Sequence, residues 1–427
     1  MARRAIDLVR PEVRELLGAP GLRLAGLREA RAARGEAVFD LTRDESPFPV
    51  PERMLAALRG APGSGGPPPP EGLPVLRRAI AGHVERRLGV DRTEQDVLVG
   101  PGHEVLDLLL SLAFDGEILV PTPAPAGFST RARVLGRPVR RLPCRREDGW
   151  LLRPVTLREA CEGARRPQLL VLGSPSEVSG LSHAADELRE LARIAEAHDL
   201  IVLSEEHQAE LHHKGQHASI ARHHPAGTIV STGLSGWAGV GDWRLGALVF
   251  PEALGVLFDA TAQLGVATFG ATSAPIQHAA AVAFEGGPEI ERHLLHARRV
   301  LAALARGCAR RLTAAGLGCA QPQAGFQCLV DFEPHGARLR ERGLATSVAL
   351  SERLLADTGV ALLAGSEVGL VPEELVLRLS IVDLDGASAL EAISVIPREQ
   401  PLDDNFLRRH APRILEALGR IAEWLAA

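Results

Sequence analysis

The sequence predicts an α/β protein built on a mainly parallel sheet, and three observations support this fold class. Short apolar runs alternate with amphipathic helical segments through the first two thirds of the chain, which is the pattern of a sheet with about seven strands. Several of these runs are apolar without interruption, as expected when helices cover both faces. The chain has 427 residues, of which 46% are hydrophobic, so it can also form a second, smaller domain.

Each element can be predicted from its residues, in chain order. The first forty residues form an arm with one helix, residues 72–89 have apolar residues at helical spacing, and the Gly/Pro-rich segment 60–70 between them is a loop. Helices are predicted over 103–114 and 184–199. The apolar runs between and after them form the strands of the sheet that these helices cover. The predicted strands lie at 96–100, 117–123, 168–175, 200–206, 227–233 and 245–250.

A long helical pattern begins near residue 288 and marks the approach to a smaller α+β region with strands near 326–334 and 376–383. We therefore expect three parts: residues 1–48 as an arm and part of the small domain, 49–295 as a large domain, and 296–427 as a small C-terminal domain.

Composition and charge exclude some classes of protein. The formal net charge is −5 and the arginines are spread along the chain, so nucleic acid is not an expected partner. No apolar run is long enough to cross a membrane and no signal peptide is recognisable, so we expect no membrane association and a cytoplasmic location. The five cysteines contain no C-x-x-C pair, which favours reduced thiols.

Motifs occur in a fixed order along nearly the whole chain. They are LTRDESPFPVP, EGLPVLRRAIAGHV, LVGPGHEVLDLLL, GSPSEVSG, LSEEHQAEL, LSGWAGVGDWRLG and VLRLSI. This order resembles the fold-type I aminotransferases of class I/II, which use pyridoxal phosphate (PLP), including the relatives of histidinol-phosphate aminotransferase. The resemblance implies a large domain with a seven-stranded, mainly parallel sheet, a smaller α+β C-terminal domain, and a homodimer.

The resemblance also assigns positions to the site. Arg244 stands at the family's phosphate arginine and Arg378 at its substrate-carboxylate arginine. Glu205, Gln208 and Glu177 replace the aspartate, tyrosine and asparagine that contact the coenzyme ring, and His207 replaces a small residue beneath it. Gly236 stands where the family has its PLP-binding lysine, and Lys214 is the only lysine of the chain.

From these departures we expect a PLP-independent enzyme without covalent PLP. It would act on an amino-acid-like or other carboxylate small molecule by acid/base or metal-assisted chemistry, in a biosynthetic pathway. Two alternatives stay open. One is a dehydratase or lyase that uses pyridoxamine or pyridoxal phosphate non-covalently, and the other is an inactive pseudo-aminotransferase that serves as a partner subunit or sensor.

The candidate catalytic residues are Glu177, Glu205 and His207, which we expect to line one cavity at the carboxyl ends of the strands. Two carboxylates in such a cavity repel each other. A divalent iron, manganese or zinc ion bound by these three residues would relieve the repulsion. Two other arrangements would also relieve it. Arginines would neutralise the carboxylates, or one carboxyl would stay protonated and act as an acid, with His207 as the base.

Four further residues are candidates for substrate binding: Arg378, Arg244, Gln208 and His103. An arginine on a strand that faces the cavity would bind a carboxylate through two hydrogen bonds. His103 begins a helix, where anions are favoured. The histidine-rich segment 207–224 shows no fixed ligand spacing, so we expect its other histidines to be surface or packing residues.

Overall fold

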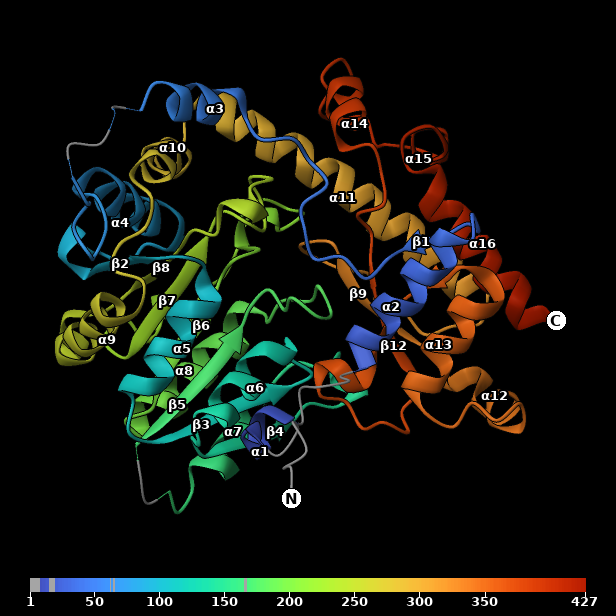
Figure 1. The fold of residues 1–427 in the computed structure, drawn as a ribbon, viewed down its shortest axis with the longest axis horizontal. Helices are drawn as coiled ribbons and strands as arrows, with labels where there is room; N and C mark the ends of the chain where they lie inside the picture. The colour runs from blue at the N-terminus through green and yellow to red at the C-terminus, as the bar shows by residue number, and fades with distance from the viewer. Residues whose placement is uncertain (1–7, 15–19, 62, 64–65, 165–166) are drawn as a thin grey trace.

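The structure is a computed structural model that describes residues 8–14, 20–61, 63, 66–164 and 167–427. The expected N-terminal arm therefore lies partly outside the described residues. A seven-stranded sheet forms the larger part of the molecule, and the C-terminal elements gather beside it (Figure 1). The prediction of a mainly parallel seven-stranded sheet is confirmed.

The strands of the large sheet follow the order β2-β8-β7-β6-β5-β3-β4. Strand β8 runs antiparallel to both of its neighbours, and the remaining pairs are parallel. The strands are β2 (Val97–Gly100), β3 (Glu117–Thr122), β4 (Val139–Pro143), β5 (Gln168–Gly173), β6 (Ile201–Glu205), β7 (Thr228–Gly233) and β8 (Gly246–Val249).

Helices cover both faces of this sheet, as the uninterrupted apolar runs predict. Along β5, Leu169 and Val171 pack toward one group of helices, while Leu170 and Leu172 pack toward the other. The first face carries α5 (His103–Ala113), α6 (Ala126–Val134) and α9 (Gly255–Thr268). The second face carries α4 (Pro74–Leu88), α7 (Pro154–Cys161), α8 (Ala185–Ala197) and α10 (Ala274–Glu285).

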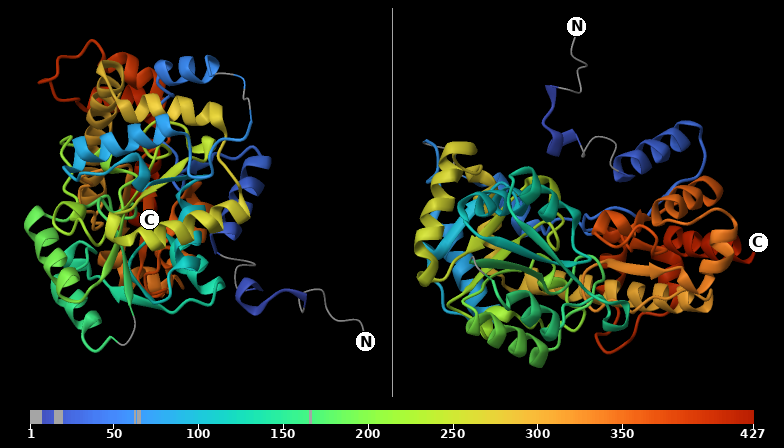
Figure 2. Two further views of the ribbon diagram at one scale, coloured as in Figure 1. Left: turned by 90° about the vertical axis from the view of Figure 1, so that its left-hand side faces the viewer. Right: turned by 90° about the horizontal axis from the view of Figure 1, so that it is seen from below.

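The long helix α11 (Pro288–Ala314) joins the sheet layer to the C-terminal elements, as Figures 1 and 2 show. It contacts the short turn after β6 at one end and α14 and α16 further along. The C-terminal part contains a three-stranded antiparallel sheet of order β11-β12-β9 and a two-stranded pair of β1 and β10. Its strands are β1 (Phe39–Asp40), β9 (Gln327–Asp331), β10 (Val360–Ala361), β11 (Leu363–Ala364) and β12 (Val376–Ser380).

The remaining helices surround these sheets. They are α1 (Pro11–Arg14), α2 (Pro20–Ala33), α3 (Glu52–Arg59), α12 (Gly336–Glu341), α13 (Ser347–Thr358), α14 (Gly386–Ile393), α15 (Asp404–His410) and α16 (Pro412–Ala426). Strand β1 pairs with β10, so the N-terminal segment joins the C-terminal part of the molecule. The expected division at residues 48 and 295 stays a prediction, and α11 crosses the second of these positions. None of the helices in the described ranges has the length and hydropathy that a membrane crossing requires.

Candidate functional site

A cavity of about 940 Å³ opens at the carboxyl ends of the parallel strands, the usual place for a ligand in an open α/β sheet. We call it the central cavity. Its walls come from the ends of β5, β6 and β7, the start of α5, the helix α6 and the strand β12. The structure places every residue of the predicted site on it: His103, Glu177, Glu205, His207, Gln208, Gly236, Arg244 and Arg378.

Strand alternation explains why Glu205 lies here. Leu203 packs against the face that carries α5, and Glu205 follows it by two residues, so both point to that side. Glu206 points to the opposite face and lines another cavity. Gln208 lines the central cavity together with Glu205. It does so because β6 ends at Glu205 and the chain then turns, so the strand alternation does not continue.

His207 and His103 lie against each other in the cavity. Their ring centroids are 4.0 Å apart and the rings are tilted by 32°. His207 is buried and its Nε2 is 3.3 Å from the Ser231 hydroxyl. Burial, His103 and Arg131 all lower the pKa of His207 well below its ordinary value. The His207 imidazole is therefore neutral at physiological pH and its Nδ1 is a potential proton acceptor.

The pKa values of the two carboxyl groups, Glu177 and Glu205, shift upward, whereas that of His207 shifts downward. Burial, together with Glu205 and Asp44, raises the pKa of Glu177 to about 8. Burial raises the pKa of Glu205 to about 7, against the opposing effect of Arg131. Both groups therefore hold protons for part of the time near neutral pH. This agrees with the option of a protonated carboxyl beside a neutral imidazole.

Arg378 reaches the cavity from the middle of β12, where it pairs with Leu329 of β9 and Leu363 of β11. The residue is 5% exposed. Its Nη2 donates to the Thr42 carbonyl at 2.8 Å and forms an ion pair with Asp44, also at 2.8 Å. Its buried Nε has no hydrogen-bond partner, so this guanidinium retains donors for a ligand.

At the other end of the cavity, Gly102 precedes α5 and His103 begins it. Arg244 approaches the same end, 3.7 Å from a carboxylate oxygen of Glu104. Arg244 has a left-handed backbone with φ 48°, which costs about 1 kcal/mol for a residue other than glycine. Backbone strain of this kind is common at ligand-binding sites.

Sequence reasoning missed a buried ion pair beside these residues. Asp107 of α5 is completely buried, and its Oδ2 lies 3.2 Å from Nη2 of Arg131 on α6. Arg131 lines the cavity, and it influences the pKa of Glu205, His103 and His207. The available signal was an aspartate inside the leucine-rich face of a helix, a position that is costly for a charge without a partner.

The fold of this chain is that of the aminotransferases. A solved structure of a Thermus thermophilus aspartate aminotransferase mutant superposes with a TM-score of 0.81 at 23% identity, over 97% of this chain and 99% of that one. The aspartate aminotransferase of Thermotoga maritima superposes with a TM-score of 0.79 at 21% identity, over 98% and 100% of the two chains. These similarities establish the fold.

The chain belongs to the aminotransferase class I and II family, whose sequence profile matches residues 37–396. It is similar to the aspartate/prephenate aminotransferase of Thermus thermophilus, with 28% identity over 78% of this chain and 84% of that protein. It also resembles the aspartate aminotransferase of Geobacillus stearothermophilus, with 26% identity over 80% and 86%. The arginine–pyruvate transaminase of Pseudomonas aeruginosa is 28% identical over 80% and 84%.

These comparisons contradict the predicted function. The expectation of a PLP-independent enzyme, and with it the dehydratase and pseudoenzyme alternatives, is wrong because the relatives are named as aminotransferases. The expectation of no covalent PLP conflicts with the same finding, since PLP is the coenzyme of this family.

The predicted metal centre at Glu177, Glu205 and His207 is also wrong. Among the described residues, no group of three or more His, Cys, Asp or Glu side chains could hold a metal ion. Glu177 and Glu205 gain protons and His207 stays neutral, so their repulsion is relieved without a cation.

The cavity fits a PLP-type coenzyme at its phosphate end and differs from the family at its amine. Arg244 and the first turn of α5 suit a phosphate, and Glu205 supplies a carboxyl group at the cavity wall. Residue 236 is a glycine, and a Cβ built there would lie 2.5 Å from the His207 carbonyl oxygen. Lys214 is exposed and is not among the residues that line the cavity.

Proposed function

We propose that this chain is an aminotransferase-family enzyme that binds a PLP coenzyme and a small amino or oxo acid in the central cavity. The names of the relatives support amino-group transfer, with aspartate as the first amino donor to test. The observation that carries the proposal is Arg378, a buried arginine on a central strand with donors left for a carboxylate.

In this proposal Arg378 binds the substrate carboxylate, and the Thr42 carbonyl and Asp44 hold its guanidinium in place. A planar guanidinium suits a carboxylate because two parallel hydrogen bonds form at once. Gln208 is buried and its Oε1 has no hydrogen-bond partner, so it can accept a hydrogen bond from the amino group of a substrate.

Arg244 and the first turn of α5, with His103, would hold the coenzyme phosphate. When bound, PLP supplies an electron-withdrawing ring that stabilises negative charge on the substrate carbon. Glu205 can hold a proton at its carboxyl group near neutral pH, and Nδ1 of the neutral His207 can accept one. Glu177 offers a second protonated carboxyl group at the cavity wall.

The enzyme differs from an ordinary aminotransferase at Gly236, where the family lysine is absent. In the family this lysine supplies the amine that reacts with the coenzyme. We propose that in this chain the amino group of the substrate takes that role. Turnover is then slower than in relatives, because proton transfer falls to weaker groups and general acid–base catalysis contributes roughly 10²–10⁴-fold to a rate. A homodimer, as is common in the family, is part of the proposal and can be checked by sedimentation.

One experiment tests the proposal. The protein is loaded with PLP, freed of excess coenzyme and assayed with aspartate and 2-oxoglutarate, with and without methylamine. We expect a retained coenzyme absorbance and slow amino-group transfer that methylamine accelerates. Arg244→Gln should weaken coenzyme retention, whereas Arg408→Gln, an exposed change far from the cavity, should not.

Borohydride reduction followed by peptide mass analysis locates any covalent attachment. Coenzyme on Lys214 would refute the role given to the substrate amine but leave the family assignment intact. A protein that retains no coenzyme and transfers no amino group would refute the proposed function.

A further inference from the structure

A second cavity, of about 510 Å³, lies on the face of the large sheet opposite the central cavity. We call it the rear cavity. Strand alternation separates the two, because Glu205 and Ser231 point toward the central side, whereas Glu206, Val230 and Thr232 line the rear cavity. Neighbouring residues at the end of β6 and along β7 therefore face different cavities.

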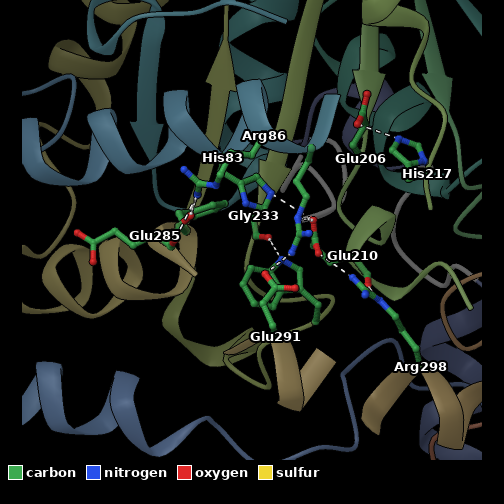
Figure 3. Close-up of polar contacts among 12 residues, drawn as sticks. His83, Arg86, Glu206, Glu210, His217, Gly233, Glu285, Glu291 and Arg298 are labelled. Atoms are coloured by element: carbon green, nitrogen blue, oxygen red, sulfur yellow. Dashed lines mark hydrogen bonds and ion pairs between the residues drawn. The ribbon is translucent and has the colours of Figure 1, made fainter. Parts of the chain in front are cut away.

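Several residues that line the rear cavity form a polar network, whose contacts Figure 3 draws. Glu210 accepts from Arg298 Nη2 at 2.9 Å and pairs with Arg87 Nε at 2.9 Å. The side chains of Glu210 and Arg298 are 7% and 12% exposed. The charge of Glu210 is therefore neutralised within the protein and leaves no need for an outside cation.

Glu206 is satisfied in a similar way. It accepts from the Ser204 hydroxyl at 2.8 Å and the Ser219 hydroxyl at 2.5 Å. Nε2 of His217 lies 2.9 Å from its other oxygen, a contact drawn in Figure 3. Both carboxylates on the wall of the rear cavity are thus engaged by donors of the protein itself.

Two arginines of the same wall have no carboxylate partner among the described residues. Arg86 donates through Nη2 to the carbonyls of Phe284 and Glu285, at 2.7 and 3.3 Å. Arg222 donates through Nε to the Leu88 carbonyl at 2.9 Å. Each guanidinium group has five N–H donors, so both keep unused donors and an uncompensated positive charge at the cavity.

The remaining wall is partly apolar, with Val84, Leu88 and Val230. A volume of this size holds a small molecule, and such sites combine apolar walls with a few charged groups. We propose that the rear cavity binds a small organic anion, which the positive charges of Arg86 and Arg222 attract and whose body lies against these apolar residues.

Binding is measured by calorimetry on the full-length protein with three probes: inorganic phosphate, phenyl phosphate and benzoate. We expect saturable binding of an aromatic anion at a site that the rear-cavity changes weaken and that central-cavity changes leave intact. Whether phenyl phosphate or benzoate binds more tightly tells which anionic group the site prefers. Arg86→Gln and Arg222→Gln should each weaken binding by roughly tenfold or more, the usual effect of losing a charge-assisted hydrogen bond.

Two control variants separate this site from others. Binding should persist in Arg244→Gln, which alters the central cavity, and in Arg408→Gln, which alters a distant exposed arginine. Circular dichroism shows whether each variant is folded, and the exposed positions of Arg86 and Arg222 make both changes tolerable.

Three results would overturn the inference. They are no saturable binding of either aromatic probe, equal affinity in both cavity variants and the parent protein, or loss of binding in Arg244→Gln. None of these readouts depends on catalysis, so failure of the proposed function leaves the test unaffected.

Discussion

Glu205 and Glu206 are adjacent in sequence, yet their side chains line two different cavities on opposite faces of the large sheet. Glu205 lies beside His207 and Arg131, and burial raises its pKa to about 7. Glu206 accepts hydrogen bonds from Ser204 and Ser219. A glutamate on one face of the sheet thus has a raised pKa, whereas the neighbouring glutamate on the other face accepts hydrogen bonds from two serine hydroxyls.

Replacing Arg378 tests the substrate site. In Arg378→Lys the positive charge remains, but the guanidinium that forms two parallel hydrogen bonds is lost. Binding of a carboxylate substrate should therefore weaken by roughly tenfold or more. The effect should fall mainly on KM measured by steady-state kinetics. Arg340→Lys, at an exposed pair with Glu333, is the control and should leave KM unchanged. An unchanged KM in Arg378→Lys would contradict the assigned role.

The raised pKa of Glu177 makes stability depend on pH. The folded state binds a proton up to about pH 8, whereas the unfolded carboxyl releases it near its ordinary value of about 4.3. The folded state therefore binds more protons between these values, and this group lowers stability as pH rises through that window.

In Glu177→Gln this contribution disappears. Relative to the parent protein, the variant should gain thermal stability steadily between pH 5 and about pH 8 and gain little more above it, as measured by Tm at each pH. Glu423→Gln, at a position on α16 far from the cavity, is the matched control and should show a constant difference. A Glu177→Gln difference that does not change with pH would show that this carboxyl ionises normally.

Gly236 is required by close packing. A Cβ at this position would lie 2.5 Å from the His207 carbonyl oxygen, so Gly236→Ala forces the backbone to move. We expect a loss of about 1–3 kcal/mol in the free energy of unfolding, measured by urea denaturation. Gly419→Ala is the control, because a Cβ there meets nothing within 4 Å. That helical change should stabilise by up to about 1 kcal/mol.

The ion pair of Arg298 and Glu210 should matter much more than an exposed one. Their side chains are 12% and 7% exposed, and removal of Arg298 leaves the buried Glu210 carboxylate with Arg87 as its remaining arginine partner. Arg298→Ala should therefore cost about 1.5–3 kcal/mol of stability. Arg420→Ala, at the exposed pair with Glu416, should cost less than about 1 kcal/mol. Similar losses in the two variants, measured by urea denaturation, would refute this account of the network.

Much of the fold follows from local patterns. The apolar run of β5 predicted a strand covered on both faces, and the structure has helices on each side of Leu169 and Leu170. The carboxyl ends of parallel strands meet at one edge, so Glu177 and Glu205 could be predicted to share a cavity. Strand alternation alone would place Gln208 on the opposite face, but a turn after β6 interrupts the alternation and Gln208 lines the central cavity.

The function drawn from single residues was wrong, although the fold was right. Gly236, Glu177 and His207 each depart from the family pattern, and these departures predict the loss of the coenzyme. Similarity along 360 residues, from 37 to 396, assigns the chain to the aminotransferase family nonetheless. The carboxylates also need no metal, because the low polarity of the cavity lets them keep protons, a property that no spacing in the sequence reveals.

By itself the sequence determined six of the seven strands of the large sheet, all but β4, and the alternation of residues between the two faces within a strand. These properties follow from periodicity within a few residues. Only the tertiary structure brought Asp107 to Arg131, carried Arg378 from the C-terminal sheet to the central cavity, and enclosed the rear cavity between α4, β7 and α11. Such meetings depend on how distant segments pack together, and packing leaves no local pattern in the chain.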